Sequence, residues 1–136
     1  SAIYERKDEI DKALIWVQKA QKVCEKVYGR MHTYTATTYN NIGRFHRKLG
    51  EYQLALDWHQ NAIEIYEQVA GNDYPNIGVL YSNLADVYFD LKHYELAQSW
   101  YKKAQTALKN CAYPNEQNVK YVEDRLTEVA MNIEKM

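Results

Sequence analysis

Residues that break secondary structure, and residues that commonly form metal or redox sites, are scarce in this sequence. Its 136 residues include two prolines, five glycines and two cysteines. The cysteines do not form a Cys-x-x-Cys pair, so the usual spacing of a zinc or redox site is absent. No apolar run approaches the roughly 20 residues that a helix needs to cross a bilayer, and no secretory signal opens the chain. We therefore expect a cytoplasmic location and no membrane partner.

A strong charge of either sign is also missing. Seventeen basic residues against 18 acidic ones give a net charge of −1, so bulk charge does not draw the chain to nucleic acid. One local run is basic, at Arg44, Arg47 and Lys48. Forty-two positions later, Asp86 and Asp90 replace Arg44 and Lys48. A sign that reverses in this way does not form a phosphate-binding track, and we expect no nucleic-acid partner.

Catalytic motifs are absent as well. The sequence has no HExxH, GxGxxG, GxxxxGK[ST] or GxSxG. Of four histidines, His46 and His59 fall on apolar stripes, and Tyr88 and Tyr101 take their places after that same interval. A core position that accepts either ring explains this exchange more simply than a metal ligand does. We expect no enzymatic activity, no catalytic residue, no metal and no cofactor.

The sequence does contain an internal repeat. Its only three tryptophans, Trp16, Trp58 and Trp100, are evenly spaced at an interval of forty-two positions. Two alanine series keep the same interval: Ala13, Ala55, Ala97 and Ala20, Ala62, Ala104. A fixed period of this length indicates an array of one structural unit, either a helical solenoid or a propeller of four-stranded blades.

The spacing of apolar residues within the unit indicates helices and not strands. From residue 52 the stripe advances in steps of three and four, through Tyr52, Ala55, His59, Ala62, Tyr66 and Val69. Strand alternation is absent, so the propeller is excluded and the fold class is all-α. Gly43 and Ala85 occupy matched places in the shorter helix before this one. Glycine costs about 1 kcal/mol inside a helix, so we expect close helix packing at Gly43.

Turn residues predict where the helices end. Gly50-Glu51 and Lys92-His93 indicate tight turns within a unit. Pro75 and Pro114 lie between units, and each is expected to open the next helix because proline is tolerated in the first helical turn. The register of the last helix is open, since these prolines are three positions closer together than one full repeat.

At this point the repeat resembles a known family. The stretch YNNIGRFHRKLGEYQLALDWHQNAIEIYEQ and its copy YSNLADVYFDLKHYELAQSWYKKAQTAL resemble tetratricopeptide repeats, in the long 42-residue form of kinesin light chains. The resemblance implies a right-handed superhelical solenoid of antiparallel helix pairs. We expect one domain over 1–136, with a partial first repeat at about 1–29, repeats at 34–70 and 76–111, and a terminal helix at 115–136. Aligned at the repeat, the chain begins partway through a unit's first helix, so we expect a fragment of a longer protein.

The same resemblance implies a scaffold that binds a protein or an extended peptide on a concave face lined by the first helix of each unit. Asn41 and Asn83 match the asparagine that commonly contacts peptide backbone, since an amide both donates and accepts. The candidate binding residues are Asn40, Asn41, Arg44, Lys48, Ser82, Asn83, Asp86, Asp90 and Arg125. Three alternatives stay open: asparagines that bond within the scaffold, a ligand-sensing regulatory domain, and a homo-oligomerisation module.

Overall fold

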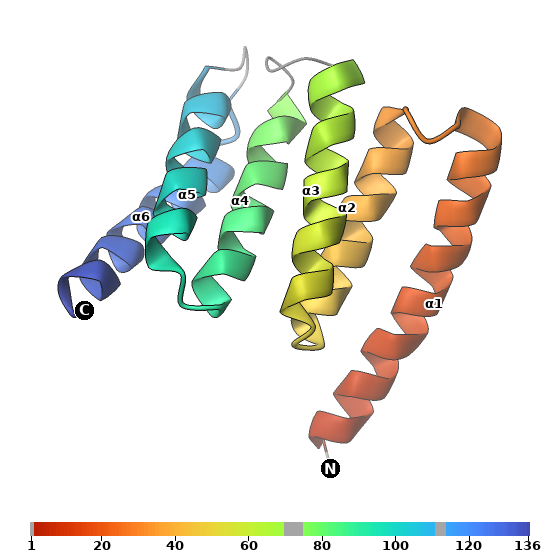
Figure 1. Ribbon diagram of the computed structural model, residues 1–136, viewed down its shortest axis with the longest axis horizontal. Coiled ribbons are helices and arrows are strands. Elements are labelled where there is room, and N and C mark those ends of the chain that lie inside the picture. Colours follow the sequence, from red (N-terminus) through yellow and green to blue (C-terminus); the bar gives the residue numbers. More distant parts are fainter. Residues whose placement is uncertain (1, 70–74, 111–113) are drawn as a thin grey trace. The chain divides into compact units, whose positions relative to one another are not determined.

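Six helices make up the described part of the computed structural model, which covers residues 2–69, 75–110 and 114–136 (Figure 1). They are α1 (Ala2–Tyr28), α2 (Thr33–Lys48), α3 (Tyr52–Val69), α4 (Pro75–Asp90), α5 (Tyr94–Lys109) and α6 (Glu116–Glu134). No strand occurs within these ranges, and the predicted all-α class is confirmed. Across the same ranges, no helix is both long and apolar enough to span a membrane.

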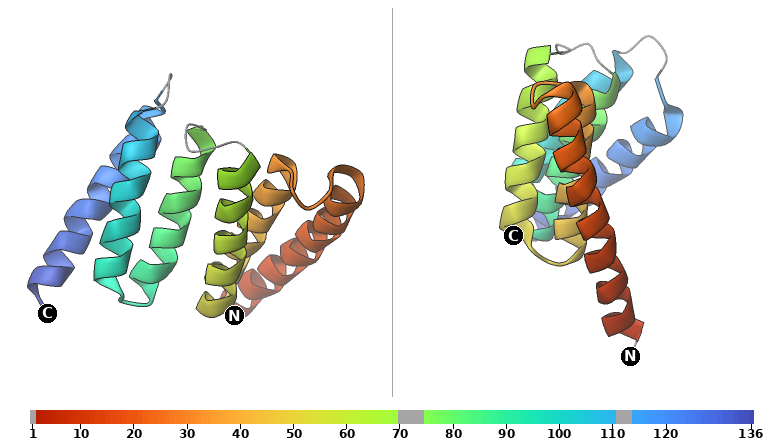
Figure 2. Two further views of the ribbon diagram at one scale, coloured as in Figure 1. Left: turned by 45° about the horizontal axis from the view of Figure 1, so that its top comes forward. Right: turned by 90° about the vertical axis from the view of Figure 1, so that its right-hand side faces the viewer.

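The chain divides into two compact units, Ser1–Ile65 and Tyr66–Met136, with the boundary inside α3. In the first unit α2 packs against α1, and the chain reverses at a short turn before α3 (Figures 1 and 2). In the second unit α5 packs against both α4 and α6. Each unit is therefore a layer of neighbouring helices that run in alternating directions.

Helix α1 differs from the sequence expectation. The chain was expected to begin partway through a unit's first helix, and Asp8 is the residue that aligns with Gly50 of the later turn, but α1 is one unbroken helix of 27 residues. The two later turns use a left-handed backbone, with φ of 79° at Gly50 and 64° at Lys92. Asp8 instead lies within the helix, where nothing interrupts the hydrogen-bond ladder. The N-terminal part of α1 consequently extends past the end of α2 (Figure 2).

A polar contact recurs once per repeat and settles the register of α6. Each time, a side chain late in the second helix of a unit contacts one in the helix that follows. The pairs are Glu25 with the Tyr39 hydroxyl, Glu67 with the Tyr81 hydroxyl at 2.8 Å, and Lys109 with Glu123 at 3.4 Å. Because Glu123 stands one full repeat after Tyr81, α6 keeps the repeat register, and the shortened proline spacing falls in the connection before it.

The two prolines act differently at the helix starts. Pro75 is the first residue of α4, as predicted. Pro114 lies ahead of α6, which begins at Glu116. The side chain of Asn115 caps that helix by accepting from the backbone N–H of residues 117 and 118 at 3.0 and 3.2 Å. Pro114 therefore precedes the cap instead of opening the helix.

Close helix contacts occur at two glycines. A Cβ added at Gly43 would lie 2.9 Å from the His59 ring, which confirms the close approach predicted there. Gly78, which the sequence analysis did not single out, is tighter, because its Cβ would meet the Leu108 Cγ at 2.7 Å. His46 and His59 are both buried, as expected for core positions. Of the two cysteines, Cys24 is half-buried, and Cys111 lies outside the described residues.

Candidate binding surface

Two adjacent asparagines of α2 have different environments. Asn40 is buried, and its Oδ1 lies 2.8 Å from Nδ1 of His59, which has no exposed surface. Burial, and then the charges of Arg47 and Arg44, lower the pKa of His59 to about 3. The ring is therefore neutral, and its Nδ1–H donates to the Asn40 oxygen. Asn41 follows Asn40 by one position and is half-buried.

The polar residues that α2 presents outward form one stripe. They are Thr37, Asn41, Arg44 and Lys48, in steps of four, three and four along the helix. Thr37, Arg44 and Lys48 are exposed. The Lys48 Nζ lies 5.6 Å from the centroid of the Phe45 ring, which helps to hold the long side chain. We call these four residues the α2 polar stripe.

The corresponding positions of α4 are more enclosed. Asn83 and Asp90 are half-buried, whereas Ser82 and Asp86 are buried. The Ser82 hydroxyl donates to the backbone oxygen of Val79 at 2.8 Å, a bond within its own helix. The α4 face therefore does not reproduce the exposed cations of the α2 polar stripe.

Asp86 lies at the centre of a polar cluster in the second unit. Its carboxylate accepts from the Tyr121 hydroxyl at 2.9 and 3.0 Å and from the Tyr101 hydroxyl. The Nε of Arg125 lies 3.1 Å from the Tyr101 hydroxyl and 3.5 Å from Asp86, and the guanidinium carbon lies 4.0 Å from the Phe89 ring centroid. The structure thus brings together two residues predicted to contact a ligand, Asp86 and Arg125, but pairs them with each other.

The electrostatics of this cluster favour a fixed ion pair. Burial, and then Asp86, raise the pKa of the Tyr101 hydroxyl above its usual range. Burial alone would lower the pKa of Arg125, but its hydrogen bond to Tyr101 and the charge of Asp86 raise it above its ordinary value. The Tyr101 hydroxyl thus stays a protonated donor beside an ionised arginine. This arrangement holds α4, α5 and α6 together.

The sequence analysis did not identify the whole cluster. Tyr101 was interpreted as a core residue, and Tyr121 and Phe89 were not singled out. Two spacings could have indicated it: Tyr121 precedes Arg125 by four residues, and Asp86 precedes Phe89 by three. Each pair shares a helix face. Only the register of α6 brings those two faces into contact.

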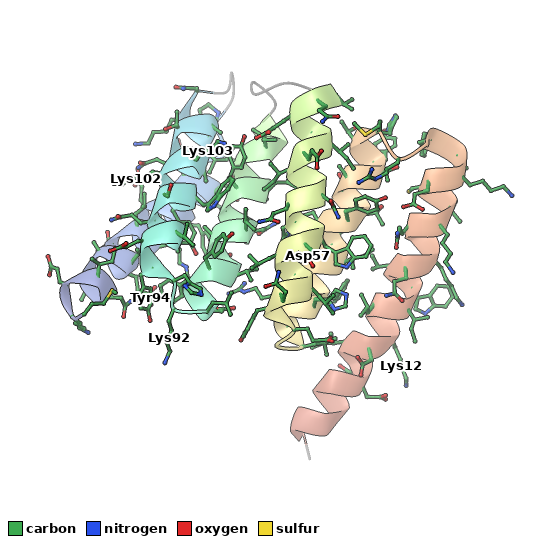
Figure 3. All side chains as sticks on the ribbon, viewed as in Figure 1. Lys12, Asp57, Lys92, Tyr94, Lys102 and Lys103 are labelled. Carbon is green, nitrogen blue, oxygen red and sulfur yellow. The ribbon has the colours of Figure 1, made fainter. Side chains whose placement is uncertain are left out.

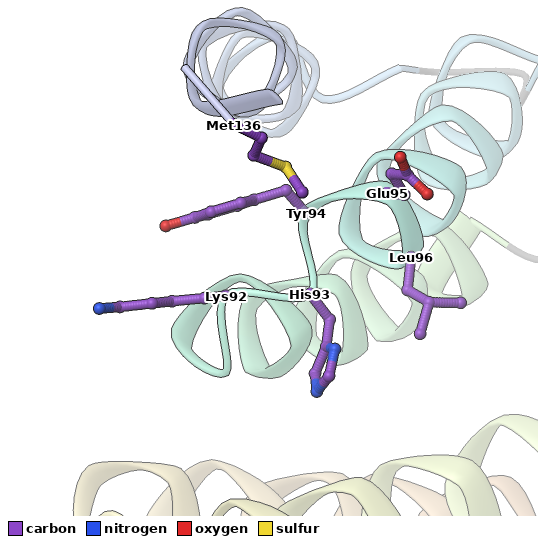
Figure 4. Close-up of a pocket in the computed structure, with 6 residues that line it drawn as sticks. All are labelled: Lys92, His93, Tyr94, Glu95, Leu96 and Met136. Carbon is purple, nitrogen blue, oxygen red and sulfur yellow. The ribbon is translucent and has the colours of Figure 1, made fainter. Parts of the chain in front are cut away.

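One pocket lies apart from all the residues that were predicted to bind a ligand. It has a volume of about 230 Å³ at the turn between α4 and α5 and is lined by residues 92–96 and Met136 (Figure 4). Lys92 and Tyr94 belong to this turn region and are labelled among the side chains of Figure 3. Ligand sites for drug-sized molecules are usually larger, at about 300–1,000 Å³. Within the described ranges, no three His, Cys, Asp or Glu side chains gather in a group that could hold a metal ion.

Comparisons with known proteins agree on the repeat. The tetratricopeptide repeat family model matches residues 34–110, more than half of the chain. No curated protein sequence is significantly similar. Among solved structures, the crystal structure of BtubC (BKLC) from P. vanneervenii is similar with a TM-score of 0.85 and 19% identity, over 97% of this chain and 53% of that one. This chain thus spans about half the length of that neighbour, and the likeness supports the fold. Together with the period of the sequence and the helix pairs, the family match shows that this chain belongs to the tetratricopeptide repeat family.

Proposed function

We propose that this chain is a non-catalytic scaffold that binds an extended, acidic peptide segment along the α2 polar stripe. The repeat family supports a protein-interaction scaffold in general. The observation that carries the finer proposal is the exposure of Arg44 and Lys48 on the same helix face as the half-buried Asn41. An amide beside two exposed cations suits a peptide backbone flanked by carboxylates.

Different residues of the α2 polar stripe would contact different parts of the peptide. Asn41 can donate to a peptide C=O and accept from a peptide N–H, so it binds backbone without reading sequence. Arg44 and Lys48 are exposed charges that attract acidic side chains, and this attraction weakens as salt is added. Asn83 stands at the repeat position of Asn41, and we retain it as a candidate backbone contact of its own unit. Asp90 stands at the repeat position of Lys48, where its carboxylate would repel an acidic peptide, so it is left out of the proposed contact.

Four other predicted residues have partners inside their own unit, which supports a structural role for them. Asn40 is bonded to His59, Ser82 to Val79, and Asp86 to Arg125. Arg125 neutralises the Asp86 carboxylate, so we propose an acidic peptide and not one that carries both signs of charge.

The test is selection from a displayed library of random peptides, followed by affinity measurement on the enriched sequences. The wild-type protein should enrich peptides rich in Asp and Glu. Arg44→Glu with Lys48→Glu should reverse that preference toward basic peptides. The matched control is Lys22→Glu with Lys26→Glu, an exposed pair on α1 with the same spacing and the same change in net charge. If both double variants select the same peptides, the stripe does not read charge and the proposal is wrong.

Substituting the two neighbouring asparagines one at a time tests peptide binding and folding separately. Each lost hydrogen bond costs about 0.5–1.5 kcal/mol, more when a buried group loses its partner. Asn41→Ala should weaken an enriched peptide about tenfold with an unchanged thermal melt. Asn40→Ala should lower the melting temperature, because the buried His59 ring loses its acceptor. Unchanged peptide affinity of the Asn41 variant would contradict the assigned backbone contact.

A further inference from the structure

One buried ring stands at the same position in both repeats. His59 of α3 and Tyr101 of α5 are one repeat apart, and neither side chain has any exposed surface. Each ring bonds a polar residue of the first helix of its own repeat. His59 bonds Asn40 of α2, whereas Tyr101 bonds Asp86 of α4. These two partners are not equivalent, because the residue that corresponds to Asp86 is Arg44. The ring of the second helix therefore selects which position of the first helix is held inside.

The place of the polar atom on each ring explains the selection. In histidine, Nδ1 is next to the ring atom that joins Cβ, and this short reach ends at the Asn40 Oδ1, 2.8 Å away. In tyrosine the hydroxyl projects from the opposite end of the ring. It reaches about one helical turn further along the first helix, to Asp86. Ser82, the equivalent of Asn40, bonds the backbone of Val79 in its own helix instead.

His59 consequently holds α2 without contacting the Arg44 guanidinium. Its Nε2 is buried and has no hydrogen-bond partner among the described residues. This nitrogen faces the backbone of Gly43, since a Cβ added there would lie 2.9 Å from it. Arg44 follows Gly43 by one position and is exposed. The ring therefore bonds Asn40 and leaves the Arg44 cation in solvent.

We propose that His59 determines the specificity of the α2 polar stripe, because its short ring keeps Arg44 available to an acidic peptide. A tyrosine at this position would place a hydroxyl beside Arg44. Such a hydroxyl already accepts from an arginine in the other repeat, where the Nε of Arg125 lies 3.1 Å from the Tyr101 hydroxyl. The buried ring thus decides whether the stripe presents its central cation. The inference rests on the proposed peptide site, since specificity requires that Arg44 contact the ligand.

The test compares His59→Tyr with His59→Phe in the 136-residue chain. Both changes remove the Nδ1 bond to Asn40 and introduce a six-membered ring, so those effects are matched. Only tyrosine adds a hydroxyl. Tyr101 packs in a repeat that carries Ala85 in place of the smaller Gly43, so we expect both variants to fold. A cooperative thermal melt checks this.

The first measurement follows solvent exchange of the Arg44 Nε–H by NMR, with no peptide present. Exchange should be fast in the wild type and in His59→Phe, and about tenfold slower in His59→Tyr, where the hydroxyl accepts from Arg44. The second measurement is the affinity for a synthetic peptide that alternates aspartate and glycine. His59→Tyr should bind it about tenfold more weakly than His59→Phe does. In an Arg44→Ala background the two substitutions should give equal affinities.

The two measurements separate this inference from the peptide site itself. Fast exchange at Arg44 in His59→Tyr would overturn the role of His59 and leave the peptide site intact. Slow exchange in the wild type would do the same, and that measurement needs no variant to fold. Slow exchange in His59→Tyr with an unchanged affinity would remove Arg44 from the peptide site, and the specificity assigned to His59 would go with it. Equal losses of affinity in the tyrosine and phenylalanine variants would reduce His59 to an ordinary core residue.

Discussion

Replacing Arg125 by methionine tests whether the Asp86 cluster is structural. The side chains of Arg125 and Asp86 are 17% and 6% exposed, so the pair is nearly removed from water. Methionine keeps an unbranched apolar stem against the Phe89 ring but removes the charge. The Asp86 carboxylate then still accepts from the hydroxyls of Tyr101 and Tyr121.

The magnitude follows from burial. Breaking a buried ion pair by removing one partner costs about 3–5 kcal/mol. Two hydroxyl donors remain, and Tyr121 is 43% exposed, so some water reaches the cluster. We therefore expect the lower end of that range, about 3 kcal/mol. Against a total stability of about 5–15 kcal/mol for a typical domain, this loss would be plain in a denaturation curve.

Urea unfolding followed by circular dichroism measures the effect, with Lys120→Met as the exposed control on the same helix. Adding Asp86→Asn should recover part of the loss, because asparagine still accepts from the tyrosines but carries no charge. A cost below about 1 kcal/mol for Arg125→Met, typical of a surface pair, would refute the buried-pair argument. Arg125 would then be available to a ligand, as the sequence first suggested.

Three further results are expected. Gly43→Ala should lower the free energy of unfolding by about 1 kcal/mol, since overpacking costs about 1–3 kcal/mol and the higher helix propensity of alanine offsets about 1 kcal/mol. Gly78→Ala should lower it further, because the added Cβ meets the branch point of Leu108. Urea unfolding curves of the two variants compare these losses. Lys92→Gly should raise stability by about 1 kcal/mol, because φ of 64° strains a residue with a Cβ; a thermal melt measures it. Neutral His59 contributes stability that is complete above pH 6.5 and is lost as pH falls toward 3, so unfolding measured at pH 7 and pH 5 should differ less in His59→Gln.

The sequence predicted most of the fold because the repeat is redundant. Each helix position appears two or three times, so the burial of His46 and His59 and the close approach at Gly43 could be inferred from their equivalents. The unbroken α1 could not be inferred in this way. Asp8 aligns with Gly50 and Lys92, and its residue type does not exclude a turn, since Lys92 adopts a φ of 64° without being a glycine.

The candidate site was less predictable, because neighbouring helical residues differ in direction by about 100°. Asn40 and Asn41 look equivalent in sequence, yet one bonds the buried His59 and the other lies on the outward stripe. Asp86 and Arg125 lie on different helices, and only tertiary packing reveals that they neutralise each other. Whether Asn41, Arg44 and Lys48 bind a peptide stays a prediction.

The recurring contact between Glu25 and Tyr39, Glu67 and Tyr81, and Lys109 and Glu123 has a consequence for how such an array can be rearranged. The first two junctions are chemically interchangeable, so a helix pair could be duplicated between them without loss. The third is not. If α6 followed α1 directly, Glu25 would face Glu123, and two carboxylates would meet where a hydrogen bond had been. These contacts would therefore allow the inner helix pair to be duplicated. They would destabilise an array in which α6 followed α1 directly.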